Sequence, residues 1–151
     1  GIIVGCHSSN PGAKEFQEAL VIPNSFRDLS NEQMLKQVQH DKPKPLYEIV
    51  AEELVKQHGE NPNCMIFMGA TYPEQLTSIR KIIGDMNILA PGVGAQGGSV
   101  ESFVKAGINS QNSGLIINAS RSIIFASSGE DFADRSREEA EKLRNEINNY
   151  R

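Results

Sequence analysis

The chain has 151 residues, a net charge of −4 and 38% hydrophobic residues, a balance typical of a protein that folds around one core. It has no block of basic residues that would favour nucleic acid or an anionic membrane, and no apolar run near the ~20 residues of a membrane span. We therefore treat residues 1–151 as one region and expect no nucleic-acid or membrane partner.

Strand and helix patterns alternate along the chain. Short apolar runs that end in polar residues, glycine or proline predict strands at 1–9, 64–69, 87–90 and 114–118. Amphipathic patterns predict helices at 13–20, 45–58, 73–83, 100–106 and 131–149. This alternation predicts a parallel α/β sheet, and strands that are apolar throughout suggest that both of its faces are covered.

Residues 21–44 interrupt the alternation. They contain prolines and asparagines and have only weak helical character, strongest at 31–39. A segment of this length is either functional, such as a lid, or a tolerated surface insertion. We favour a surface insertion or loop, with a helix at 31–39.

Two architectures fit four strand–helix units. They could form a small open sheet, or half of a (β/α)8 barrel, which usually needs about 250 residues. The first residues, GIIVGC, already read as a strand, and this favours a half-barrel cut from a longer chain. In both architectures the functional groups are expected where the strands end.

The residues that follow the predicted strands are small and polar. They lie at 7–10, 69–71, 91–98 and 118–121 and include one long amide and one arginine, but no carboxylate or lysine. The glycine-rich loop at 91–98 and Arg121 suit a phosphate group, whereas no general acid or base is evident. We expect His7 to be a hydrogen-bonded residue of the barrel interior and Thr71 to be no more than a helix cap.

The two cysteines are expected to be free thiols. Cys6 and Cys64 lie within predicted strands, which is typical of a protein in the reducing cytoplasm. The three histidines are scattered, and no spacing typical of metal ligands occurs. We therefore expect no metal.

Four segments together resemble orotidine 5′-monophosphate decarboxylases. Pro91–Gly98, PGVGAQGG, and Ser120–Ile123, SRSI, resemble that family's phosphate-binding segments. Ser9–Ala13, SNPGA, and Gly69–Glu74, GATYPE, resemble the segments after its fifth and sixth strands, in its longer-chain branch. The resemblance implies the C-terminal half, strands five to eight, of a phosphate-binding (β/α)8 TIM barrel. The implied reaction converts orotidine 5′-monophosphate to uridine 5′-monophosphate and CO2 in pyrimidine biosynthesis, without cofactor or metal.

The resemblance implies six substrate-binding residues: Ser9, Pro91, Gln96, Gly97, Ser120 and Arg121. Gln96 and Arg121 would hold the 5′-phosphate, together with backbone N–H groups near Gly97 and Ser120. Ser9 would hydrogen-bond the pyrimidine ring. Pro91 would lie near the departing carboxylate.

The family's catalytic motif is absent from this chain. DxKxxD occurs nowhere in the 151 residues, so we assign no catalytic residue here and predict that the chain is inactive without the N-terminal half of the barrel. Complete barrels of the family are expected to form homodimers. Two alternatives remain open: a non-catalytic half-barrel that binds a nucleoside monophosphate, and a related phosphate-sugar lyase such as a hexulose-phosphate synthase, for which no strand-end acidic cluster provides magnesium ligands.

Overall fold

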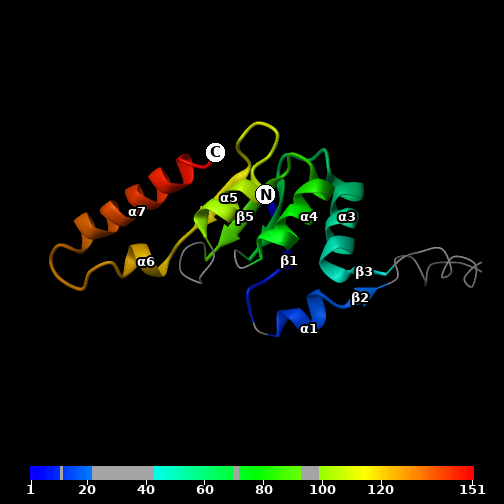
Figure 1. Ribbon diagram of the computed structural model, residues 1–151, viewed down its shortest axis with the longest axis horizontal. Coiled ribbons are helices and arrows are strands. Elements are labelled where there is room, and N and C mark those ends of the chain that lie inside the picture. The colour runs from blue at the N-terminus through cyan, green and yellow to red at the C-terminus, as the bar shows by residue number, and fades with distance from the viewer. Residues whose placement is uncertain (11, 22–42, 70–71, 93–98) are drawn as a thin grey trace, which may run out of the picture.

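Four parallel strands form the centre of the protein in its computed structural model, which describes residues 1–10, 12–21, 43–69, 72–92 and 99–151 (Figure 1). The strands β1 (Ile2–His7), β4 (Cys64–Met68), β5 (Asn87–Pro91) and β6 (Leu115–Asn118) pair in the order β1-β4-β5-β6. This order follows the chain without a reversal, as successive strands of a (β/α)8 barrel do, whereas a doubly wound sheet reverses its order. The predicted parallel α/β sheet is confirmed.

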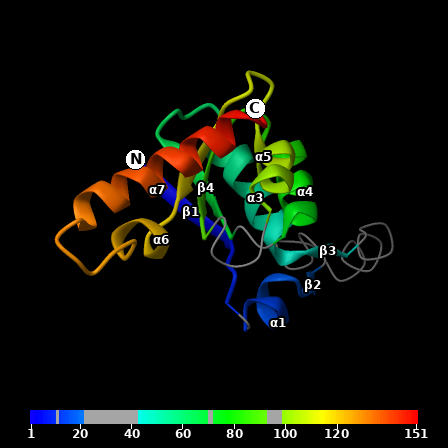
Figure 2. The same cartoon turned by 60° about the vertical axis from the view of Figure 1, so that its left-hand side comes forward.

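The helices that follow the strands cover one face of the sheet. Figure 2 shows α3 (Leu46–His58), α4 (Pro73–Ile83) and α5 (Val100–Gly107) on the same side of the strands. Between these helices and the sheet lies an apolar core that water does not reach. Its fully buried side chains include Ile66, Met68, Leu76, Ile79, Ile88 and Phe103.

The opposite face of the sheet is partly open. The strand register places Gly5, Phe67, Leu89 and Ile116 in one row across that face. At its margins Ile3 is 51% exposed and Ile116 is 46% exposed. The expectation that both faces of the sheet are covered is therefore not met within the described residues, and a second apolar surface is available there.

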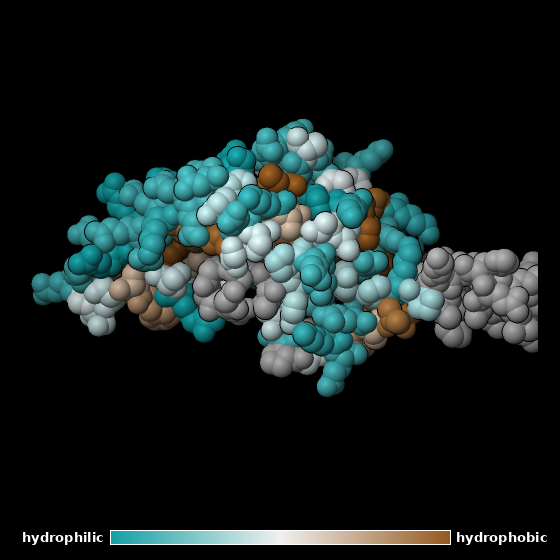
Figure 3. All heavy atoms as spheres, in the orientation of Figure 1, coloured by the Kyte–Doolittle hydropathy of each residue, from teal (hydrophilic) through white to brown (hydrophobic). Residues whose placement is uncertain are grey.

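The last helix lies beyond the β6 edge of the sheet. In α7 (Phe132–Asn148), the half-buried Leu143 and Ile147 pack against the core. A short helix, α6 (Arg121–Ile124), precedes it; it is not among the helices predicted from the sequence. In the described part of the chain, no helix is long and apolar enough to cross a membrane, and the surface seen in Figure 3 is mainly hydrophilic with small, separate hydrophobic patches.

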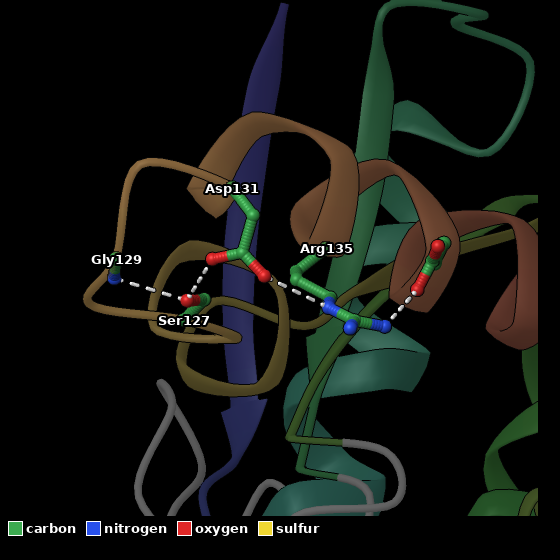
Figure 4. A network of polar contacts seen from close by, with 5 residues as sticks. Ser127, Gly129, Asp131 and Arg135 are labelled. Carbon is green, nitrogen blue, oxygen red and sulfur yellow. Dashed lines mark hydrogen bonds and ion pairs between the residues drawn. The ribbon is translucent and has the colours of Figure 1, made fainter.

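A polar network shapes the loop between α6 and α7 (Figure 4). Asp131 accepts hydrogen bonds from the Ser127 hydroxyl at 2.6 Å and from Arg135 Nε at 3.1 Å. The Gly129 N–H donates to Ser127 Oγ at 3.0 Å, and Arg135 also pairs with Glu138 at 2.9 Å. The Ser127 and Arg135 contacts hold the pKa of Asp131 below its ordinary value. Since all these groups are exposed, the network orders the loop more than it stabilises the fold.

The excursion predicted at 21–44 has its two ends paired. Helix α1 (Ala13–Gln17) is three residues shorter than predicted, because the chain extends into β2 (Leu20–Val21), which pairs antiparallel with β3 (Lys44–Pro45). The helix predicted at 31–39 lies outside the described residues. The other predicted strands and helices agree with the structure within two residues at each end.

Candidate functional site at the carboxyl ends of the strands

The ends of β1 and β4 lie in direct contact. The Gly69 N–H, just after β4, donates to the His7 carbonyl oxygen at 2.7 Å. A Cβ atom on Gly69 would lie 2.5 Å from Ser9 Oγ and 2.8 Å from Ser9 N, closer than non-bonded atoms can approach. The absence of a side chain at Gly69 therefore permits the position of Ser9, which remains partly exposed at this edge of the sheet. Sequence reasoning placed Gly69 here without assigning it this role.

The ends of β5 and β6 lie together in the same way. Pro91 is the register partner of Asn118, and the Gly92 N–H donates to the Asn118 carbonyl oxygen at 3.0 Å. Gly92 has a φ of 85°, a conformation that favours glycine. The Ser120 hydroxyl donates to Asn118 Oδ1 at 3.3 Å. Pro91 and Ser120, two of the predicted site residues, thus flank Asn118, which sequence reasoning noted at the strand end but did not assign to the site.

Arg121 lies at the same edge, as the first residue of α6. Its side chain is exposed, and no hydrogen bond or ion pair joins it to another residue in the described part of the chain. An exposed arginine often serves only in a surface ion pair, and no such pair is formed by Arg121 among the described residues. A guanidinium can bind the oxygens of a phosphate or carboxylate through two parallel hydrogen bonds. Gln96 and Gly97 lie outside the described residues, so their placement beside Arg121 stays a prediction.

The prediction that His7 points into the interior of a barrel is wrong. Gly5 pairs with Phe67 and His7 pairs with Met68, which leaves Cys6 as an extra residue in β1. Such a bulge reverses the alternation of side chains beyond it. His7 consequently faces the helices, beside the fully buried Met68, and not the open face of the sheet.

His7 is nevertheless hydrogen-bonded, as expected. It is 1% exposed, and its Nε2 lies 3.2 Å from Glu18 Oε1. Because a carboxylate only accepts, Nε2 carries the proton of this hydrogen bond. The rings of Tyr47 and Tyr72 meet the imidazole edge-on, with centroids 5.4 Å and 5.1 Å away. Thr71, the expected cap of α4, lies outside the described residues, and the residue at the cap position is Tyr72.

Two ionisable groups beneath this edge stay neutral near pH 7. Burial raises the pKa of the Cys6 thiol to about 12. Burial, with smaller contributions from the negative charges of Glu48 and Glu18, raises the pKa of Tyr47 to about 12. Both cysteines are free thiols, as predicted. Because both groups hold their protons near pH 7, neither Cys6 nor Tyr47 is suited to exchange a proton with a ligand at the strand ends.

Among the described residues, no group of three or more histidine, cysteine, aspartate or glutamate side chains could hold a metal ion. The groups at the strand ends are hydroxyls, an amide, backbone N–H groups and one guanidinium. They can bind an anion and hydrogen-bond a polar ring. The structure is that of a parallel α/β protein with candidate anion-binding groups directly after its strands.

Comparison with known proteins finds one group of enzymes that this chain resembles. The chain is 41% identical over 148 residues to orotidine 5′-phosphate decarboxylase of Cellvibrio japonicus, a match that spans 98% of this chain and 47% of that protein. It is 38% identical over 151 residues to the Cupriavidus metallidurans protein of the same name, covering 100% of this chain and 48% of the relative. No family model matches the chain.

Solved structures give the same result. Leishmania donovani OMP decarboxylase superposes with a TM-score of 0.65 at 25% identity, over 96% of this chain and 47% of that one. UMP synthase of the same organism gives a TM-score of 0.66 at 29% identity, over 96% of this chain and 27% of that one. The resemblance to orotidine 5′-phosphate decarboxylases is confirmed along the whole chain. The chain spans about half the length of the curated relatives it matches, which is consistent with a C-terminal half.

Proposed function

We propose that this chain supplies the phosphate- and pyrimidine-binding half of an orotidine 5′-phosphate decarboxylase. The observation that carries the proposal is the full-length match to half of such enzymes. The sheet agrees with it, because its strand order is sequential and, among the described residues, the helices that follow the strands cover one face and leave the other partly open. In a (β/α)8 barrel the open face becomes the interior and the two edge strands pair with the other half. The four strands would correspond to strands five to eight.

The substrate of the complete enzyme would be orotidine 5′-monophosphate. Arg121 and Gln96 would hold its 5′-phosphate, with backbone N–H groups near Gly97 and Ser120. Arg121 suits this role because it is exposed at the edge where β6 ends. Binding energy from a phosphate that does not react can be directed to the transition state of the reacting part.

The other end of the substrate would lie towards β1 and β5. Ser9 would hydrogen-bond the pyrimidine ring from the end of β1. Pro91 would lie near the carboxylate that departs from C6 as CO2. Ser9 is partly exposed beside Gly69, and Pro91 ends β5 beside Asn118, positions that suit these roles.

The bond-breaking groups would come from the companion half, which we define as the half of the Cellvibrio japonicus relative that this chain does not match. The chain has no DxKxxD, the motif whose lysine would protonate the C6 carbanion after CO2 leaves. We accordingly propose that the chain is inactive alone. We further propose that the complete barrel acts without a cofactor or metal, forms a homodimer and resides in the cytoplasm.

Binding of uridine 5′-monophosphate, the product, tests the assignment of Arg121. The chain is assembled with the companion half, and its affinity is measured by isothermal titration calorimetry. Arg121→Ala should weaken binding by about 10- to 150-fold, the loss of a hydrogen bond to a charged group. The matched control is Arg137→Ala on α7, whose exposed side chain pairs with Glu141. Equal affinities for both variants would contradict the assignment. Binding by the chain alone, without turnover in the assembly, would favour the non-catalytic alternative.

A further inference from the structure

The C-terminal end of α1 contacts the C-terminal end of β1 through two neighbouring side chains, those of Gln17 and Glu18. Gln17 Oε1 accepts a hydrogen bond from the Ser8 backbone N–H at 2.8 Å. Glu18 Oε1 accepts one from His7 Nε2 at 3.2 Å. Gln17, the last residue of α1, and Glu18, its C-cap, therefore hold the consecutive residues Ser8 and His7 at the end of β1. Ser9, the next residue, is the one assigned to the pyrimidine ring.

The histidine end of this contact is fixed. His7 is 1% exposed and lies between the ring edges of Tyr47 and Tyr72. Its Nδ1 has no hydrogen-bond partner among the described residues, so the bond to Glu18 is the polar contact that orients the ring there. An imidazole enclosed by two aromatic rings cannot swing away without opening the packing. Glu18 is thus tied to a rigid part of the protein.

The residue that follows Glu18 is attached to α3. The Leu46 N–H, at the start of α3, donates to the Ala19 carbonyl oxygen at 3.0 Å. The pairing of β2 with β3 continues this link, and Figure 2 shows α1 beside these two strands, below α3. Helix α1 and the residues that follow it therefore connect the C-terminal end of β1 to the start of α3.

Ser9 also lies against the backbone of Gly69, the residue after β4. There is no room for a Cβ atom between the two residues. Ser9 is consequently confined by β4 on one side and, through Ser8, by α1 on the other. Its position depends on both contacts.

We propose that Gln17 and Glu18 are positioning residues for pyrimidine recognition, which they support by fixing the chain on which Ser9 lies. This proposal rests on the proposed function. Neither residue is assigned a contact with substrate, and the groups assigned to phosphate lie after β5 and β6, at the other end of the sheet order. We call the contacts of Gln17 with Ser8 and of Glu18 with His7 the clamp. Loss of the clamp should affect recognition of the base and leave recognition of the phosphate unchanged.

The test compares two ligands on the chain assembled with the companion half: uridine 5′-monophosphate, and ribose 5-phosphate, which lacks the base. Gln17→Met keeps the size of the side chain and removes the acceptor of the Ser8 N–H. We expect an affinity loss of about tenfold for uridine 5′-monophosphate and none for ribose 5-phosphate. Gln17→Glu keeps an acceptor oxygen and should bind both ligands like the wild type. Glu15→Met, on the exposed side of the same helix, is the matched control.

Amide hydrogen exchange provides a readout that does not depend on nucleotide binding. In the free assembly, Gln17→Met should accelerate exchange in the segment 8–10 and leave β4 and β5 unchanged. Unaltered exchange there would overturn the clamp, as would an equal loss of affinity for both ligands, which indicates general destabilisation. A wild-type assembly that binds ribose 5-phosphate but not uridine 5′-monophosphate would contradict the proposed function, and the exchange result would still decide on the clamp.

Discussion

Arg80 is expected to be a major source of stability at the edge of the sheet opposite the strand-end site. Its guanidinium donates twice to the Gly107 carbonyl oxygen, through Nε at 2.8 Å and Nη2 at 2.5 Å. Its Nη1 donates to the carbonyl oxygens of Gly84 at 2.8 Å and Met86 at 2.7 Å, and a longer contact of 3.4 Å reaches Gly114. These carbonyls lie where α4 and α5 end and where the chain enters β5 and β6. Burial lowers the pKa of Arg80 to about 10, so it remains charged near pH 7.

Arg80→Met should lower the free energy of unfolding by about 3 kcal/mol. The short hydrogen bonds reach the carbonyl oxygens of Gly84, Met86 and Gly107, and satisfying each of these carbonyls contributes about 1 kcal/mol net. Partial exposure of the side chain keeps the sum near this value. With a urea m-value of about 2 kcal/mol/M, the denaturation midpoint should fall by roughly 1.5 M. Arg80→Lys should lose most of the same stability, because one ammonium group cannot reach carbonyls arranged for a planar fork.

Urea denaturation followed by far-UV circular dichroism measures the effect. The matched control is Lys81→Met, the exposed neighbour on α4, which should stay within about 0.5 kcal/mol of the wild type. An Arg80→Met midpoint as close to the wild type as that of the control would refute the assignment. At temperatures where the variant is folded, its affinity for uridine 5′-monophosphate in the assembly should be unchanged, because Arg80 lies far along the strands from the site.

Two further outcomes follow from the geometry. Gly69→Ala should displace Ser9 and weaken the binding of uridine 5′-monophosphate, measured by calorimetry. The matched control is Gly12→Ala, where the new Cβ atom would meet nothing within 4 Å. Equal effects of the two substitutions would contradict the steric argument. The backbone and hydroxyl hydrogen bonds from Ser110 hold the pKa of the Asp85 carboxyl below its ordinary value, so its stabilising contribution is present above about pH 4 and is lost as the pH falls through the depressed folded-state pKa. Urea denaturation should therefore show Asp85→Asn less stable than the wild type at neutral pH, and a gap that persists at the lowest pH would be inconsistent with this linkage.

The sequence predicted the sheet because its strands and helices differ in period. The apolar runs at 64–69 and 87–90 have no helical periodicity, whereas 73–83 is clearly amphipathic. Since carboxyl ends of parallel strands share one edge, the chain order alone was enough to expect Ser9, Pro91 and Ser120 at that edge. The structure places these three residues there.

What the sequence did not predict depends on contacts between distant residues. The bulge at Cys6 turns His7 towards the helices. The pattern of residue types along a strand does not show where one extra residue interrupts the pairing. Arg80 appears in the sequence as an ordinary charged residue of a surface helix, yet Gly107, whose carbonyl it binds, lies 27 positions away. The contacts of Gln17 and Glu18 likewise form only when α1 folds back on β1.

The central claim is that this chain is the substrate-holding half of a decarboxylase. The most direct measurement combines the chain with the companion half and follows orotidine 5′-monophosphate by the loss of orotate-ring absorbance. We predict turnover by the assembled pair, none by this chain alone, and a strong reduction with Arg121→Ala. A correctly assembled pair that binds uridine 5′-monophosphate and releases no CO2 would contradict the claim.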